Sequence, residues 1–262
     1  MLLSLSLLVL SAGGDVPCAG EPPTHSACQR LGLNCSGSSS LDPAQCAFFQ
    51  DLHDSTNGSK WHGCNATRND PCNCYDEGRN LISYCVDGDL VNLQLNSNHL
   101  RGTIPASIGA ATNLKYLDLG DNNQPLGGRN RANALHGPIP ASIGALTNLE
   151  LLHLGGSDWL QGGVPAALGG LTKLKSLYLM HNRLTGTIPA ELGALSDLRV
   201  FYLYNNLLSG RVPPLNFTRI GKYCGIGDAK GANDGNKFCT PLPKGASHCN
   251  LEGHIKTKGK CS

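Results

Sequence analysis

A leucine-patterned segment recurs five times between residues 90 and 214, and it constrains the fold more than any other feature of the sequence. It begins at Leu90 and restarts after intervals of 24, 35, 25 and 24 residues, at Leu114, Leu149, Leu174 and Leu198. We interpret the interval of 35 as one of 24 with an insertion of about 11 residues, spanning Asn123 to Asn133, and the interval of 25 as containing one extra residue near Trp159. A unit this short cannot bury its own leucines, so neighbouring units must stack against each other. The sequence therefore predicts a solenoid whose core runs along the stack.

Each fixed position of the repeat has a physical role. Leu93 and Leu95 are two residues apart, so both point to one side of a short strand. The asparagine that follows the strands, as at Asn98, Asn182 and Asn206, can satisfy backbone donors and acceptors at the turn. The Ile-Pro or Val-Pro pair that comes next favours an extended residue followed by a helical turn. One strand and one helical turn per unit predict an α/β solenoid.

The full pattern, LxxLxLxxNxLxGxIPxxLGxLxx, resembles that of plant-type leucine-rich repeat proteins, for example in Leu100-Arg-Gly102-Thr-Ile104-Pro105. This family includes secreted polygalacturonase-inhibiting proteins and the ectodomains of leucine-rich-repeat receptor kinases. The resemblance covers about Cys46 to Cys249 and is strongest over residues 90–214. It implies a right-handed superhelix of five repeats, a parallel sheet on the concave side, and ligand binding rather than catalysis.

The cysteines flank the repeats. Eight of the 12 precede them and four follow, and none lies inside. A predicted helix from Cys46 to Asp54, followed by Trp61 and a cysteine cluster, resembles the family's N-terminal cap, and the segments around Cys224 and Cys239 resemble its C-terminal cap. We expect disulfides within each cap, with the connectivity left open. The cysteines concerned are Cys18, Cys28, Cys35, Cys46, Cys64, Cys72, Cys74, Cys85, Cys224, Cys239, Cys249 and Cys261.

The start of the chain predicts export. Residues 2–10 are almost wholly apolar, and the small residues after them suit cleavage between Ala12 and Asp15. The alternative is a truncated gene model, or an apolar start that is no signal. We predict a signal peptide at 1–14, a cysteine-containing extension at 15–45, an N-terminal cap at 46–89, five repeats at 90–218, and a C-terminal cap with a basic tail at 219–262. No stretch is long enough for a stable membrane anchor, and the expected location is secreted, either extracellular or in the cell wall.

Four sequons mark predicted glycosylation sites. They are Asn34, Asn57, Asn65 and Asn216. All lie in or beside a predicted cap, so glycans there would leave the concave sheet open.

The variable strand positions predict where a partner binds. They form columns on the concave sheet, with an aromatic group towards the last two repeats, and tyrosine and methionine are enriched in protein interfaces. The candidate partner-binding residues are Tyr116, Asp118, Asp121, His153, Tyr178, Met180, His181, Tyr202, Tyr204 and Asn205. Arg129 and Arg131, in the insertion, form a second candidate surface.

Several other functions are disfavoured. A formal net charge of +2 argues against a general nucleic-acid binder. Asp118 and His153 occupy neighbouring repeats of one column and could touch, but no nucleophile accompanies them and no catalytic motif is present, so we expect no enzyme. Cys72-x-Cys74 lacks a zinc spacing, and residues 228–236 lack the acids of a calcium loop. We expect no metal and no cofactor.

The leading hypothesis is a secreted recognition protein that binds a partner protein or a cell-wall polysaccharide on its concave sheet, for example as an inhibitor. One alternative is an ectodomain-like part of a membrane receptor or co-receptor. A second alternative is a structural protein of the extracellular matrix. The oligomeric state is not predicted.

Overall fold

The structure of the 262-residue chain is a computed structural model. It describes residues 41–64, 69–75, 81–121, 133–221, 223–227, 235–239, 242–246 and 249. Several predictions lie outside the described residues: the signal peptide and the segment that follows it to residue 40, the sequons at Asn34 and Asn65, the arginines Arg129 and Arg131, and the cysteines Cys18, Cys28, Cys35 and Cys261.

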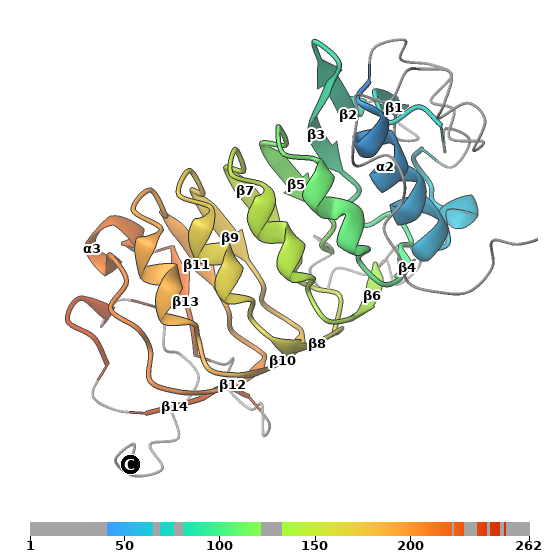
Figure 1. Ribbon diagram of the computed structural model, residues 1–262. Coiled ribbons are helices and arrows are strands. Elements are labelled where there is room, and N and C mark those ends of the chain that lie inside the picture. Colours follow the sequence, from blue (N-terminus) through green and yellow to red (C-terminus); the bar gives the residue numbers. More distant parts are fainter. Residues whose placement is uncertain are drawn as a thin grey trace, which may run out of the picture.

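The stacked coils form an α/β solenoid with one long sheet, as predicted (Figure 1). Its strand order is β1-β2-β3-β5-β7-β9-β11-β13. The strands are β1 (Asn73–Tyr75), β2 (Leu81–Val86), β3 (Asp89–Gln94), β5 (Tyr116–Asp118), β7 (Leu151–His153), β9 (Ser176–Tyr178), β11 (Val200–Tyr202) and β13 (Cys224–Gly225). Pairing is parallel from β3 onwards and antiparallel between β1, β2 and β3. The two strands before the repeats thus cover the edge that the first coil would otherwise leave open.

A second parallel sheet runs along the coils where the Leu-x-Gly part of each repeat lies. Its order is β14-β12-β10-β8-β6-β4. The strands are β4 (Arg101–Gly102), β6 (Ala134–Gly137), β8 (Trp159–Gly163), β10 (Arg183–Gly186), β12 (Leu207–Gly210) and β14 (Lys237–Phe238). The repeat pattern predicted one strand per unit and did not predict this second one.

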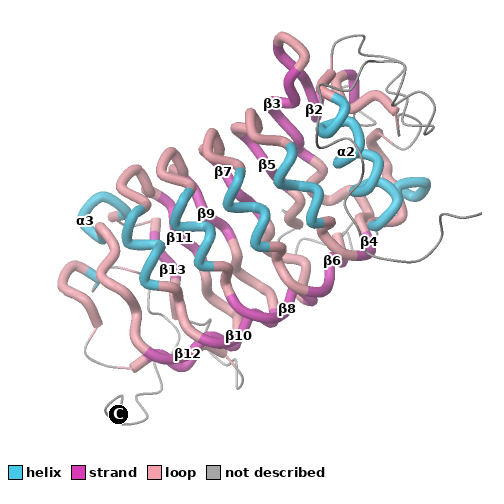
Figure 2. The backbone as a smooth tube through the Cα atoms, viewed as in Figure 1, coloured by secondary structure: helices cyan, strands magenta, loops and turns pink. Residues whose placement is uncertain are grey.

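Short helices form a row on the other side of the coils (Figure 2). Four 3₁₀ helices follow the Ile-Pro or Val-Pro pairs: η2 (Ala106–Ala110), η3 (Ala141–Ala145), η4 (Ala166–Gly170) and η5 (Ala190–Ala194). The helical turn after each dipeptide is therefore present, but it begins one residue later than predicted, because the proline is the extended N-cap residue and not the first residue of the turn. After the fifth pair the α-helix α3 (Phe217–Ile220) takes this place. The strand leucines, the leucine of the second sheet and the apolar residue of each helical turn are buried in one continuous core.

A ladder of asparagines ties each coil to the one before it. Asn206 is representative: its Nδ2 donates to the carbonyls of Leu179 and Leu203, and its Oδ1 accepts the amide of Leu184. The buried members are Asn98, Asn133, Asn182, Asn206 and Asn236. The predicted backbone-satisfying role of the repeat asparagine is therefore confirmed, and it also crosses between coils.

The insertion is displaced by one residue from its predicted position. The predicted insertion ends at Asn133, but this side chain is buried and serves as the ladder asparagine of the second coil, donating to the carbonyls of Leu95 and Leu119. It precedes Ala-Leu-His-Gly, the same x-Leu-x-Gly that follows Asn182. Because only this asparagine lies next to the second-sheet strand, the insertion falls before it.

The ladder is interrupted in the third coil. Ser157 stands where the other coils have asparagine, and its buried Oγ has no hydrogen-bond partner among the described residues. One extra residue separates Ser157 from Leu160, and Asp158 adopts a left-handed φ of 61° to accommodate it. The extra residue predicted near Trp159 is therefore present at the point where the ladder loses its side chain.

The N-terminal cap is built around a helix, as the sequence indicated. Helix α2 (Pro43–Ser55) begins after Asp42, whose carboxylate accepts the amides of Ala44 and Gln45. Its phenylalanines are fully buried against the first coil, and Phe49 meets the buried Trp61 edge-on. Trp61 follows the single-turn 3₁₀ helix η1 (Gly58–Lys60). Gln45 joins the cap to β3 by accepting the amide of Leu90.

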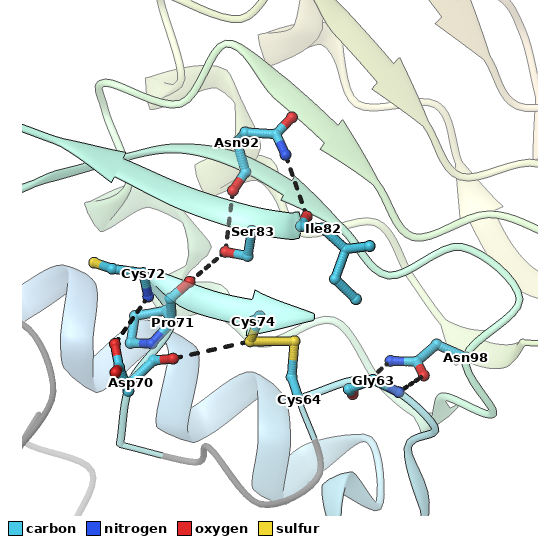
Figure 3. Close-up of a disulfide and its surroundings, with 10 residues drawn as sticks. All are labelled: Gly63, Cys64, Asp70, Pro71, Cys72, Cys74, Ile82, Ser83, Asn92 and Asn98. Atoms are coloured by element: carbon cyan, nitrogen blue, oxygen red, sulfur yellow. Dashed lines mark hydrogen bonds between the residues drawn. A yellow bond between two sulfur atoms is a disulfide. The ribbon is translucent and has the colours of Figure 1, made fainter. Parts of the chain in front are cut away.

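Disulfides fasten both ends. In the N-terminal cap, Cys64 pairs with Cys74 (Figure 3) and Cys72 with Cys85. In the C-terminal cap, Cys224 pairs with Cys249. Cys46 and Cys239 are also disulfide-bonded. All eight cysteines within the described ranges are therefore oxidised. Each of the three described disulfides joins two cysteines of the same cap.

The C-terminal cap continues the repeat. Cys224 and Ile226 take the positions of the paired strand leucines, β13 joins the long sheet, and β14 joins the second sheet. Asn236 continues the ladder by accepting the amide of Leu208. The structure thus adds a degenerate sixth coil to the five predicted repeats.

Candidate binding surface on the concave sheet

The strand registers bring the predicted column together. Gln94, Asp118, His153, Tyr178 and Tyr202 are consecutive partners across β3, β5, β7, β9 and β11. In each strand the residue before the column member is a buried leucine or phenylalanine of the core. Because side chains alternate along a strand, the column lies on the opposite, open face. The sequence-based alignment of the column is therefore correct.

Four rings of this face form a continuous chain of contacts, which we call the aromatic cluster. Its members are Tyr178, Tyr202, Tyr204 and His181. Ring centroids lie 5.6 Å apart between Tyr178 and Tyr202, 5.8 Å between Tyr202 and Tyr204, and 5.1 Å between Tyr204 and His181. The last two contacts are edge-on, an arrangement favoured by the ring quadrupole. All four side chains are partly exposed, so the cluster offers preformed aromatic surface to a ligand.

His153 is buried, which corrects its assignment as a partner-contacting residue. Its side chain is 5% exposed, its Nδ1 lies 2.7 Å from Asp118 Oδ1, and its ring meets Tyr178 edge-on at 5.1 Å. The Asp118–His153 contact inferred from the column is thus present. His153 Nε2 is buried and has no hydrogen-bond partner within the described part of the chain. His153 therefore supports Tyr178 from the side and cannot reach a ligand through Nε2.

Glycines in the next column make room for these side chains, a role that the analysis of the sequence did not assign. A Cβ on Gly120 would lie 2.6 Å from Cε1 of His153, and one on Gly155 would lie 2.6 Å from Sδ of Met180. Gly225, which continues the first column as the partner of Tyr202, acts in the same way, because a Cβ there would lie 2.9 Å from the Tyr204 ring. A Cβ at any of these distances would force its neighbour to shift, so the glycines let the large residues lie over the backbone of a neighbouring coil. The signal was visible in the sequence as glycines at two successive positions of one column.

His181 and Asn205 form the edge of the cluster. Both are in the left-handed region, with φ of 53° and 55°, in the position just before the ladder asparagine. Asn205 Nδ2 lies 3.0 Å from His181 Nδ1. Burial lowers the pKa of His181, and the carboxylate of Asp158 opposes this in part. A neutral His181 can accept the Asn205 N–H at this distance.

Tyr202 and Tyr204 keep their hydroxyl protons. Burial raises the pKa of Tyr202, with the phenols of Tyr178 and Tyr223 adding to the effect, and burial followed by the Tyr202 phenol raises that of Tyr204. Each phenol can therefore donate and accept hydrogen bonds beside its apolar ring.

The remaining predicted residues lie at the start of the sheet face. Tyr116 lies on β5 two residues before Asp118, on the same face. Asp121 accepts a hydrogen bond from Ser97 Oγ at 2.8 Å and is the last described residue before the insertion. The ring contacts of the aromatic cluster continue to His153 on β7. The second candidate surface, Arg129 and Arg131, lies outside the described residues.

Neither a metal centre nor a membrane span is found in the described ranges. No group of three or more histidine, cysteine, aspartate or glutamate side chains is placed to hold a metal there. Cys72 and Cys74 lie in disulfides. Among these residues no helix has the length and hydropathy needed to cross a bilayer.

Comparisons with known proteins agree with the architecture. A family model described as Leucine Rich Repeat matches residues 173–195. No curated protein matches the sequence significantly. The fold is similar to a chain of the PEPR1–AtPEP1 crystal structure, with 26% identity and a TM-score of 0.50 over 68% of this chain. This chain spans only 23% of the length of that one.

Two further solved structures are similar over comparable lengths. One is the ectodomain of the receptor kinase SOBIR1 from Arabidopsis thaliana, with 22% identity, a TM-score of 0.49, and coverage of 66% of this chain and 86% of that one. The other is the Arabidopsis receptor kinase HAESA with the peptide hormone IDA and the co-receptor SERK1, with 33% identity, a TM-score of 0.46, and coverage of 61% and 23%.

Proposed function

We propose that this leucine-rich repeat solenoid binds a protein or peptide ligand on the concave sheet, at the aromatic cluster. The observation that carries the proposal is the chain of partly exposed rings from Tyr178 to His181 across β9 and β11. Tyrosines give large contact areas at a low cost in side-chain entropy, and they are enriched among the residues that dominate binding energy.

The cluster is also held in place before a ligand arrives. Tyr178 is supported by the buried His153, which is fixed by Asp118, and Tyr204 lies against Gly225. A preorganised surface loses little further entropy on binding. The likeness to the PEPR1 chain, which was solved together with AtPEP1, supports ligand recognition by this scaffold.

The mode of action we propose is occupancy. The imidazole that could serve as a base, His153, is buried between Asp118 and Tyr178. An inhibitor and a receptor-type recognition subunit would use the same open face. A glycan is the second candidate ligand, because sugar rings stack on exposed tyrosines.

We further propose that the protein works outside the cell. Its eight described cysteines are all in disulfides, which persist in oxidising compartments. The predicted signal peptide, the caps at 46–89 and 219–262 and the four sequons belong to the same proposal. At Asn216 the carboxamide is exposed and caps α3, and Asn57 is exposed at the start of η1.

A displayed library of linear peptides, selected on the wild-type chain, tests the proposal. Enriched peptides would be measured by fluorescence anisotropy against a Tyr178→Ala/Tyr202→Ala/Tyr204→Ala variant. We expect the Kd to rise at least about 100-fold, since each anchor of this kind contributes about 2 kcal/mol or more. A glycan array, probed with the same two proteins, examines the second candidate.

The control is Trp159→Ala/Leu207→Ala, which removes two exposed apolar side chains from the second sheet. We expect it to leave the Kd within about twofold. Equal loss in both variants, or peptides that bind the triple variant as tightly as wild type, would reject the aromatic cluster as the site.

A further inference from the structure

A polar pocket lies at the N-terminal end of the second sheet, away from the column of the aromatic cluster. Its volume is about 340 Å³, and Asn57, Lys60, His62, His99 and Arg101 line it. Two of these residues are permanent cations, two are imidazoles and one is a carboxamide. Among the described residues, no carboxylate lines the pocket.

The two imidazoles face each other although 37 residues separate them in sequence. His62 Nε2 lies 3.2 Å from His99 Nε2, and the rings are nearly perpendicular, with centroids 4.3 Å apart. The cause is a double hydrogen bond between their chain neighbours: the Gly63 amide donates to Asn98 Oδ1 at 2.6 Å, and Asn98 Nδ2 donates to the Gly63 carbonyl at 3.1 Å (Figure 3). The disulfide from Cys64 to Cys74 holds the same segment. The pair is therefore a fixed part of the cap.

The backbone of His99 is adapted to this contact. Its φ is 62°, in the left-handed region, whereas the residues at the same repeat position, Ala134, Arg183 and Leu207, are not left-handed. Histidine tolerates this region better than most residues, though at some cost. The equivalent residue of the third coil, Asp158, is also left-handed, but there one extra residue follows in the chain. The first coil has no extra residue, and its left-handed His99 lies beside His62 at the border with the cap.

The opposite wall is anchored as well. The Arg101 amide donates to the Thr56 carbonyl at 2.9 Å, which places β4 beside Asn57. Lys60 ends η1, and the neighbouring Trp61 is buried with its Nε1 donating to the same Thr56 carbonyl. The side chains of Lys60 and Arg101 are exposed and free to adjust, while the backbone that carries them is fixed.

We propose that this pocket binds an anionic group, a carboxylate, sulfate or phosphate, between Lys60 and Arg101, with the His62–His99 pair and Asn57 supplying further hydrogen-bond donors. Charged donors bind such groups more strongly than neutral ones do, and the guanidinium of Arg101 matches two oxygens at once. The volume suits one sugar or amino-acid residue that carries the acidic group. The pocket shares no residue with the aromatic cluster, so anion binding there can be tested independently of ligand binding at the cluster.

The test is an NMR titration of the full chain at low salt with inorganic phosphate, sulfate and glucuronate, with neutral glucose as a reference. Asn57 heads a sequon, so the Ser59→Ala background is used, which removes the sequon and keeps Asn57. Saturable shifts confined to residues 57–63 and 98–102, with any of the three anions and not with glucose, support the proposal. The tightest-binding anion then tells an acidic sugar from a sulfate or phosphate source.

Two double variants distinguish a specific anion site from a general attraction of anions by positive charge. Lys60→Gln/Arg101→Gln is expected to weaken anion binding about tenfold or more, whereas Lys115→Gln/Arg199→Gln, which removes the same charge elsewhere, changes it less than about twofold. His99→Asn keeps a residue that tolerates the left-handed backbone and should weaken binding to a smaller extent. Thermal unfolding checks that each variant is folded.

Three results would overturn the proposal. The first is the absence of saturation with every anion, and the second is equal weakening by both double variants. The third is binding of Zn²⁺ that depends on His62 and His99 while no anion binds, because the pocket would then be a cation site.

Discussion

The two faces of the long sheet are made by alternating residues of the same strands, yet they are organised differently. On β9, Leu177 is fully buried and its counterparts in the other four repeats are leucine or phenylalanine. The next residue, Tyr178, lies on the open face, where its counterparts are Gln94, Asp118, His153 and Tyr202. Stacking requires the same shape in every coil on one face and leaves the other free. Substitutions at adjacent residues of one strand can thus change either the stability of the fold or the recognition of a ligand.

The largest expected loss of stability comes from a substitution on the inner face. Leu177→Ala removes a fully buried side chain with neighbours in two adjacent coils, and should lower the free energy of unfolding by about 2–5 kcal/mol. Tyr178→Ala, the adjacent residue on the open face, should cost clearly less. Chemical denaturation of the two variants measures the difference, and equal losses would show that the two faces are not separable.

A smaller loss is expected when the ladder is cut. Asn206→Ala leaves the carbonyl of Leu203 without its Asn206 donor and the amide of Leu184 without its Asn206 acceptor, inside the core. Each such group costs about 1–3 kcal/mol. Asn205→Gly changes the neighbouring residue while tolerating its left-handed backbone, and serves as control in the same denaturation experiment. If the two variants are equally stable, the ladder contributes nothing beyond packing.

The inner face was predictable and the open face only in part. Leucines at intervals of three and then two residues, as in LxxLxL, identify the strands, because the inner face allows few substitutions. The ladder was misread at one point, since Asn122 also fits the leucine count and only the Ala-Leu-His-Gly after Asn133 reveals the correct residue. The open column was aligned correctly, but the burial of His153 depends on the missing side chain of Gly120.

Two other features depend on contacts that no local pattern carries. The cap disulfides join cysteines whose alternatives are equally close in sequence, so the cysteine count could not select the pairing. The His62–His99 pair depends on Asn98 binding the backbone of Gly63 across the cap boundary. Neither histidine belongs to a motif.

A substitution with a modest expected effect on stability tests whether the two faces depend on each other. Gly120→Ala places a methyl group where the His153 ring lies, so His153 must move and Tyr178 loses its support. We expect a loss of about 1–3 kcal/mol in stability together with weaker peptide binding. The control is Gly163→Ala, whose Cβ would approach no atom closer than 3.9 Å. Unchanged binding by Gly120→Ala would mean that Tyr178 needs no support.

The smallest effect is a pH dependence at the edge of the cluster. Because burial lowers the pKa of His181, the unfolded chain takes up its proton at a higher pH than the folded chain. The contribution of His181 is therefore fully present above its ordinary pKa of 6.5 and is lost as the pH falls below that value. His181→Gln should flatten this part of the stability profile measured between about pH 7 and 5. A profile that keeps its slope in the variant would assign the effect to another group.

Hydrogen–deuterium exchange with a selected peptide bound tests most directly where recognition takes place. The account predicts slower exchange on β9, β11 and the turns that follow them, residues 176–182 and 200–206, with the second-sheet strands β10 and β12 unchanged. Protection confined to the second sheet, or to either cap, would contradict it.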